Sequence, residues 1–250
     1  MHTTSADGTE LEYETRGSGQ PLVLVHGTSA REESFRRLVP HLEDDFEVVT
    51  YDRRGRGTNR TERASGDYDL SKEVADLQAV VESVEGTPVV FGHSFGGLTA
   101  LEAADGMAVD RLVLYEPSIL SGEPHGGDLA ARIRSRVAAG DPAGGVEAFF
   151  EAVGANHLVG GPVVEQAAEI VDTVAREIDV VENYELGDPE TGVPTLLLAG
   201  EDGPDHLQAA IRALTERLDD TERVTLADTG HLGNNTAPER VAAAIREFAA

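Results

Sequence analysis

The chain has no cysteine and a single lysine, Lys72, among its 250 residues. The absence of cysteine excludes disulfides, zinc sites with thiolate ligands and a cysteine nucleophile. No apolar run approaches the roughly 20 residues that a helix needs to cross a bilayer. Residues 1–7 contain neither a basic region nor an apolar stretch, so no signal peptide is visible. We therefore expect a cytoplasmic protein.

Basic residues are scarce, with 20 Lys and Arg against 46 Asp and Glu and a formal net charge of −26. Because this charge repels nucleic acid and anionic membranes, we expect neither as a partner. Regular apolar periodicity argues against disorder. The acids are scattered along the chain, which is typical of a halophile, where molar salt shortens the Debye length to about 3 Å. An acidic protein from a low-salt cytoplasm is the alternative.

Strand-like and helix-like segments alternate along most of the chain. Because this alternation builds parallel sheets, we expect the α/β class, with a doubly wound, mostly parallel sheet of eight strands. The predicted strands are residues 2–5, 9–15, 22–25, 46–51, 88–91, 109–115, 195–199 and 223–227. The predicted helices between them are 31–43, 71–84, 95–104, 206–218 and 237–249.

The alternation stops after the segment Tyr115-Glu116-Pro117. Residues 119–190 hold no convincing strand and instead predict helices near 128–139, 142–153 and 162–184. We therefore predict a helical cap at 119–190, inserted after the sixth strand, with residues 1–118 and 191–250 as the core. Side chains of the cap that could line a pocket are Phe149, Phe150, Leu158 and Tyr184.

The segment Gly92-His93-Ser94-Phe95-Gly96-Gly97 joins the strand 88–91 to the helix that follows. Gly92 and Gly96 lack a Cβ, so strand and helix can approach closely around Ser94. The turn would present the Ser94 hydroxyl near a helix N-terminus, whose free N–H groups suit a developing oxyanion. A glycine-rich turn that contains serine by chance is the alternative, but the flanking strand and helix favour a nucleophile.

A serine hydroxyl needs an adjacent base to act as a nucleophile. Of the eight histidines, His231 lies in the loop between the last strand and the last helix. Because parallel strands open their carboxyl ends on one edge, this loop can reach Ser94. We expect His26 and His93, which lie in turns, to shape the site, and His206 to be exposed at the start of a helix.

The order Ser94, an acid, then His231 on this alternation resembles the α/β-hydrolase family over essentially the whole chain. The segments 51–57 and 115–117 are similar to its capped serine esterase and cofactor-free haloperoxidase-like branch. The resemblance implies that His26-Gly27-Thr28 is the oxyanion loop and that the backbone N–H groups of Thr28 and Phe95 form the oxyanion hole. We expect no cofactor and no metal, because the sequence holds no H-x-x-H-like ligand cluster.

The third member of the triad departs from the family pattern. The family's acid commonly lies three residues after the glycine that ends the penultimate strand, a position held here by Gly203. We expect Asp202 to be the acid, because the turn at Gly203-Pro204 could direct its carboxylate to His231. Asp205 is expected to cap the next helix. Glu116, at the end of another strand, is the alternative acid.

The predicted function is that of a serine hydrolase, acting on a small ester or related acyl substrate through an acyl-enzyme. A haloperoxidase- or perhydrolase-like reaction, or the hydrolysis of a C–C bond, could use the same triad. A receptor-like protein that keeps the fold and binds a ligand with little turnover is the alternative of another class. Nothing in the sequence indicates an oligomeric state.

Overall fold

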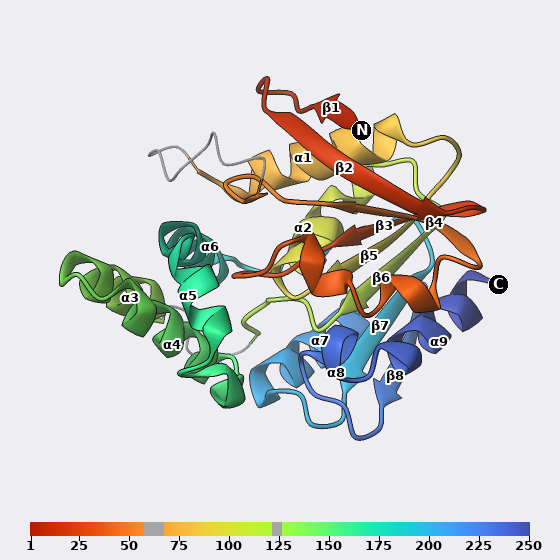
Figure 1. Cartoon of the computed structure of the whole chain (residues 1–250). Coiled ribbons are helices and arrows are strands. Elements are labelled where there is room, and N and C mark those ends of the chain that lie inside the picture. The colour runs from red at the N-terminus through yellow and green to blue at the C-terminus, as the bar shows by residue number, and fades with distance from the viewer. Residues whose placement is uncertain (58–67, 122–126) are drawn as a thin grey trace.

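The computed structural model of the chain describes residues 1–57, 68–121 and 127–250. Within them, eight strands form one sheet in the order β1-β2-β4-β3-β5-β6-β7-β8 (Figure 1). Only the pairs β1–β2 and β2–β4 are antiparallel. This confirms the predicted mostly parallel eight-stranded sheet. The strands are β1 His2–Thr4, β2 Glu10–Gly17, β3 Gln20–Val25, β4 Phe46–Tyr51, β5 Val89–His93, β6 Arg111–Tyr115, β7 Thr195–Gly200 and β8 Thr221–Leu226.

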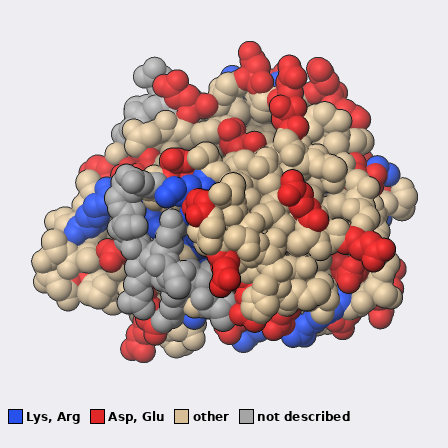
Figure 2. Space-filling model, turned by 90° about the horizontal axis from the view of Figure 1, so that it is seen from above, with Lys and Arg blue, Asp and Glu red and all other residues tan. Residues whose placement is uncertain are grey.

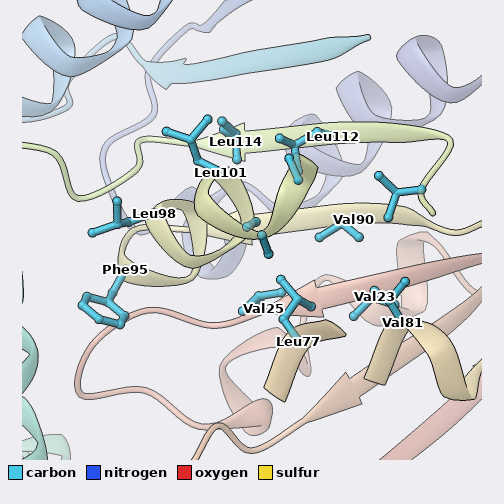
Figure 3. Packing of buried hydrophobic residues seen from close by; sticks show 14 of the residues in the cluster. Val23, Val25, Leu77, Val81, Val90, Phe95, Leu98, Leu101, Leu112 and Leu114 are labelled. Atoms are coloured by element: carbon cyan, nitrogen blue, oxygen red, sulfur yellow. The ribbon is translucent and has the colours of Figure 1, made fainter. Parts of the chain in front are cut away.

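The two faces of the sheet carry separate apolar layers. Successive side chains of β3 point to opposite faces, so Val23 and Val25 join one layer and Leu22 and Leu24 join the other. The first layer packs against α1 (Leu70–Ser83), α2 (Phe95–Ala103) and α7 (Asp205–Arg217), and Figure 3 shows part of it. The second layer packs against α9 (Pro238–Ala249) and two short 3-10 helices. Burial on both faces explains the unbroken apolar runs of the central strands.

The predicted helix 31–43 is wrong. The structure has two 3-10 helices instead, η1 (Glu32–Phe35) and η2 (Val39–His41). Pro40 lacks an N–H and its ring would clash with the carbonyl four residues earlier, so an α-helix cannot continue through it. Three further short helices in the described part of the chain were not predicted, η4 (Ala104–Gly106), η5 (Asn156–Leu158) and α8 (Gly233–Thr236).

The start of α7 also differs from the prediction. Asp205 is the first helical residue and its side chain makes no capping hydrogen bond, because Pro204 occupies the N-cap position. In the first turn of α7, Gln208 donates from its side-chain amide to the Gly200 carbonyl at 2.5 Å. The side chain of Gln208 thus ties α7 to the end of β7.

A group of helices follows β6 and precedes β7, and lies to one side of the sheet (Figure 1). We call it the helical segment; its α-helices form an apolar cluster of their own, while Val181 of α6 joins the sheet's first layer. Nothing in the sequence marks the break that divides the predicted helix 162–184 into α5 and α6. The elements are α3 Leu129–Ala138, α4 Pro142–Ala152, η5 Asn156–Leu158, α5 Pro162–Ala168 and α6 Val171–Asn183.

Residues 122–126, within the predicted cap, lie outside the described residues, as do residues 58–67. In the described part of the chain, no helix combines the length and the apolar character that crossing a membrane requires.

Candidate active site

Ser94 lies at the sharp turn from β5 into α2. Its backbone has φ 57° and ψ −120°, a strained conformation for a residue with a side chain. The turn is possible because strand and helix almost touch: a Cβ on Gly92 would lie 2.5 Å from the Gly96 carbonyl oxygen, and one on Gly96 would lie 2.2 Å from that of Val25. The two glycines therefore do what the sequence predicts, and the Ser94 side chain projects from the end of the strand.

His231 lies within hydrogen-bonding distance of the serine, with its Nε2 3.1 Å from Ser94 Oγ. Both side chains are more than nine-tenths buried. The loop that carries His231 is held by His93, whose Nε2 donates to the His231 carbonyl at 2.8 Å. Burial, with a smaller contribution from His231, lowers the pKa of His93 to about 3. His93 is therefore neutral at physiological pH and supports the His231 loop without adding charge beside the base.

The carboxylate on His231 belongs to Glu116 and not to Asp202. Glu116 Oε2 is 2.7 Å from His231 Nδ1, and its Oε1 accepts the Gly200 N–H at 2.8 Å. Asp202 is exposed, and its contact with the histidine loop is made by its backbone N–H, which donates to the Thr229 carbonyl. The preference for Asp202 is therefore corrected in favour of the alternative, Glu116.

The strand order explains why Glu116 reaches the histidine. β6 lies between the strand of Ser94 and β7, and Glu116 directly follows it. A left-handed backbone, φ 43°, turns the chain at Glu116, and its N–H donates to the Leu198 carbonyl. A Cβ on Gly203 would lie 2.0 Å from Glu116 Oε1. The position where the family commonly has its acid is thus a glycine, and the Glu116 carboxylate occupies the space beside it.

Hydrogen bonds from Arg53 and His26 fix the peptide group that precedes Thr28. Arg53 donates to the His26 carbonyl at 2.9 Å and to the Gly27 carbonyl at 3.2 Å, and His26 Nδ1 also lies 3.0 Å from the Gly27 oxygen. In a trans peptide the C=O and N–H point in opposite directions. Fixing the Gly27 carbonyl therefore fixes the direction of the Thr28 N–H, and Thr28 lines the same cavity as Ser94.

The second expected oxyanion donor, the N–H of Phe95, belongs to the first residue of α2 and so has no acceptor within the helix. The Arg53 guanidinium lies over the Phe95 ring, 4.8 Å from its centroid. Arg53 thus contacts both segments that carry the expected donors. In the sequence, only the three arginines within residues 53–56 pointed to these contacts.

Two buried arginines, Arg53 and Arg56, connect the site to the helical segment. Arg53, Arg54 and Arg56 are fully buried, and Arg53 and Arg56 both pair with Glu177 of α6. Burial raises the pKa of Glu177, but the two guanidinium groups outweigh it and hold that pKa below its usual value. Glu177 is therefore ionised. Its buried ion pair with Arg53 joins α6 to the residue whose guanidinium contacts the His26 and Gly27 carbonyls.

An apolar cavity of about 240 Å³ opens on Ser94. Phe149 lines it as expected, whereas Phe150 and Leu158 pack within the helical segment and Tyr184 donates to Glu102. His206 was expected to be exposed, but it is half-buried and lines the cavity. Burial, and the proximity of His231, lower the pKa of His206. The other lining residues are Thr28, Ser118, Ile119, Leu120, Gly127, Leu129, Ala152, Val153, Ile178, Val181, Glu182, Leu207 and His231.

Ser118, which is not among the predicted site residues, contacts the candidate nucleophile. Its Oγ lies 2.9 Å from Ser94 Oγ, and its backbone N–H donates to the Ser94 carbonyl at 3.0 Å. Its place two residues after Glu116, at the end of the strand beside β5, was the available signal.

In the described part of the chain, no group of three or more His, Cys, Asp and Glu residues could hold a metal ion.

Comparisons with known proteins agree with this architecture. An alpha/beta hydrolase of Sphaerobacter thermophilus superposes over 100% of both chains with a TM-score of 0.86 and 27% identity. A thermophilic esterase of Thermogutta terrifontis gives a TM-score of 0.80 at 24% identity, over 100% of this chain and 97% of that one, which shows the shared fold.

The sequence is also 35% identical, over 136 residues, to a 2-heptyl-3-hydroxy-4-quinolone dioxygenase of Rhodococcus erythropolis, covering 51% of this chain and 48% of that protein. The chain spans about half the length of such curated relatives. The model of the Alpha/beta hydrolase family matches residues 22–244, nearly the whole chain. The chain therefore belongs to the alpha/beta hydrolase family.

Proposed function

We propose that this protein is a serine hydrolase that cleaves a small carboxylic ester, or a related acyl compound, through an acyl-enzyme. The observation that carries the proposal is the hydrogen-bonded series Ser94–His231–Glu116, with distances of 3.1 and 2.7 Å, at the end of an apolar cavity. A nucleophile beside a base, with the base oriented by a third group, is the arrangement that acyl transfer needs.

In the proposed reaction, Ser94 Oγ attacks the carbonyl carbon and its proton passes to His231 Nε2. Glu116 accepts a hydrogen bond from His231 Nδ1 and stabilises the imidazolium that forms. His231 then gives the proton to the leaving alcohol. Water attacks the acyl-enzyme by the same path, and the proton returns to Ser94 when the acid leaves.

The negative charge on the carbonyl oxygen would be stabilised by the backbone N–H groups of Thr28 and Phe95. Donors that are fixed before the reaction cost no reorganisation when the charge develops, which makes this a large contribution to catalysis. The hydrogen bonds from Arg53 to the oxyanion loop support this role, because they fix one of the two donors.

We further propose that the helical segment acts as a cap that selects the acyl group. Phe149 and Ile178, from α4 and α6, line the cavity together with Leu207 of the core. A cavity of about 240 Å³ with mostly apolar walls favours short, apolar acyl chains over long or charged ones. We also propose a cytoplasmic protein that is adapted to high salt, and the acidic composition supports the adaptation to salt.

The direct test is turnover of 4-nitrophenyl esters with acyl chains of increasing length. We expect activity that is highest for short chains, and loss of at least about 10³-fold in the Ser94→Ala variant, as when a triad nucleophile is removed. Turnover retained in Ser94→Ala would contradict the proposal. Binding of esters without turnover in the wild type would instead support a receptor-like protein.

The same experiment separates the reactions that could share these side chains. One relative is named a dioxygenase, so oxygen uptake is measured alongside acid release. Release of one acid per ester without oxygen uptake supports the hydrolase. Activity confined to peracid formation would indicate a perhydrolase in place of the ester hydrolase. Activity confined to C–C bond cleavage would indicate a C–C hydrolase, and turnover that consumes oxygen would indicate a dioxygenase.

A further inference from the structure

The Ser94 hydroxyl has two hydrogen-bond partners, and the base is only one of them. His231 Nε2 lies 3.1 Å from Ser94 Oγ and Ser118 Oγ lies 2.9 Å from it. Ser118 is half-buried and lines the cavity. A hydroxyl has one proton to donate and two lone pairs that accept. The direction of each of the two hydrogen bonds therefore has to be established.

The hydrogen-bond directions follow from Glu116. An ionised carboxylate only accepts, so the proton between Glu116 Oε2 and His231 Nδ1 is carried by the histidine. In a neutral imidazole the other nitrogen, Nε2, then has a lone pair and accepts. The Ser94 proton is consequently directed to His231. Because Ser94 has no second proton, the hydrogen bond to Ser118 must run the other way, with the Ser118 O–H donating to Ser94 Oγ.

We propose that Ser118 is a further catalytic residue, whose hydroxyl donates a hydrogen bond to Ser94 Oγ whenever that oxygen carries negative charge. The proposal rests on the serine hydrolase mechanism given above. Ser94 Oγ becomes charged twice in each cycle, first as the attacking nucleophile and later as the leaving group of the acyl-enzyme. Hydrogen bonds to charged groups are about twice as strong as neutral ones, so the contact strengthens in both transition states.

The protons balance without any transfer from Ser118. In acylation the bond from Ser94 Oγ to the carbonyl carbon forms, the Ser94 proton moves to His231, and the leaving alcohol takes it. In deacylation a water oxygen bonds to the carbonyl carbon, and its proton passes through His231 to Ser94 as the Ser94 ester bond breaks. Ser118 keeps its own proton throughout.

The geometry allows the hydroxyl to be removed cleanly. The position of Ser118 is fixed by its backbone, since its N–H donates to the Ser94 carbonyl at 3.0 Å. The Ser118→Ala variant keeps this bond and loses only the hydroxyl. Ser118→Thr retains a hydroxyl and tests rescue, and Ser135→Ala, at an exposed position of α3, is the matched control.

The experiment measures three rates: inactivation by a small fluorophosphonate, the burst of 4-nitrophenol that reports acylation, and the steady phase that reports deacylation. For Ser118→Ala we expect all three to fall by about 10- to 100-fold, with KM changing far less, as for a lost donor to developing charge. Ser118→Thr should recover part of each rate, and Ser135→Ala should match the wild type.

Each other outcome overturns the proposal. Unchanged rates in Ser118→Ala would leave the hydroxyl with a packing role only. A change in KM and acyl-chain preference, with fluorophosphonate inactivation unchanged, would make it a pocket residue. Faster reaction in Ser118→Ala would mean that Ser118 withdraws the Ser94 proton from His231. Absence of ester turnover in the wild type would contradict the proposed hydrolase function. That result can be distinguished from a failure of the Ser118 proposal, in which the wild type is active and only the variant behaves unexpectedly.

Discussion

Glu116 is held in place by its backbone and by both oxygens of its carboxylate. It is fully buried, its backbone has a left-handed φ of 43°, and its two carboxylate oxygens contact the Gly200 N–H and His231 Nδ1. A residue with a side chain adopts this backbone conformation at a cost, which is usual at functional positions. The strain is therefore consistent with a carboxylate that must meet the histidine at a fixed angle.

The variant Glu116→Gln should lose about 10²- to 10⁴-fold in turnover, because an amide can neither fix the required tautomer nor stabilise the imidazolium. Asp202→Asn should remain close to the wild type, since its carboxylate is exposed and does not contact His231. Turnover and thermal unfolding are measured together, so that loss of folding is recognised. If Asp202→Asn is nearly inactive and Glu116→Gln has normal turnover, then Asp202 and not Glu116 is the acid that orients His231.

Gly203→Ala should also lower turnover, although it removes no functional group. Its Cβ would lie 2.0 Å from Glu116 Oε1 and 2.9 Å from the carboxyl carbon, so the carboxylate must move off His231 or off Gly200. Gly187→Ala is the matched control, because a Cβ there meets nothing within 4 Å. Equal turnover in both variants would show that the carboxylate tolerates the displacement.

The residues Ser94 and His231 could be predicted because each lies in a loop that the strand and helix pattern places at the same sheet edge. The acid was assigned to Asp202 although His231 contacts Glu116 in the structure, because two segments offered a carboxylate near that edge and the sequence does not decide between them. The choice depends on the turn at Glu116 and on the space beside Gly203, which are properties of packing. The contact of Ser118 with Ser94 and those of Arg53 with residues 26 and 27 were missed for the same reason, because they join segments that lie apart in the sequence.

At the scale of elements, the ion pairs of Glu177 join α6 to the loop after β4. The Glu177 carboxylate contacts Arg53 at 3.0 Å and also pairs with Arg56, with all three side chains fully buried. Such a group is costly to desolvate but more costly to leave incomplete, because the remaining charge stays buried. The helical segment is thereby fixed relative to the site.

Glu177→Gln should lower the free energy of unfolding by about 3 kcal/mol, because two buried guanidinium groups lose a counter-charge. Asp179→Asn, on the same helix, removes an exposed pair with Arg134 and should cost at most about 1 kcal/mol. Urea unfolding midpoints with their slopes measure both. Equal losses in the two variants would show that burial does not decide the strength of these pairs.

The type of each element was predicted well where a long apolar periodicity supported it. It was predicted poorly where a proline or an unmarked break ended a helix. The strands and α1, α2, α7 and α9 follow the expected pattern within a few residues. The segment 31–43 was predicted as one α-helix, but Pro40, which lies within η2, interrupts the α-helical hydrogen bonds, and two 3-10 helices form instead. The break between α5 and α6 has no proline or glycine, so periodicity alone could not reveal it.

At the scale of the whole molecule, acidic side chains dominate the charge. Figure 2 shows Asp and Glu side chains distributed over the viewed face, with Lys and Arg in fewer places. The net charge of −26 would repel itself across the surface at low ionic strength. The buried arginines do not reduce this repulsion, because their charges are balanced by the buried carboxylates that they contact and not by the acids on the surface.

Thermal unfolding should therefore depend on salt. Raising potassium chloride from dilute buffer to 1 M reduces the Debye length from beyond 10 Å to about 3 Å, so we expect the midpoint temperature to rise, with most of the gain below 1 M. Sucrose at a matched osmolality is the control, because it stabilises without screening. A flat or falling midpoint in potassium chloride would reject the high-salt adaptation.

The proposed mechanism depends above all on Ser94 being the nucleophile, activated by His231 and Glu116. The most direct measurement is the site and rate of covalent labelling by a fluorophosphonate, followed by peptide mass spectrometry. We predict one adduct on Ser94, none in Ser94→Ala, and much slower formation in Glu116→Gln. An adduct at another residue, or labelling of Ser94→Ala at the wild-type rate, would contradict the account.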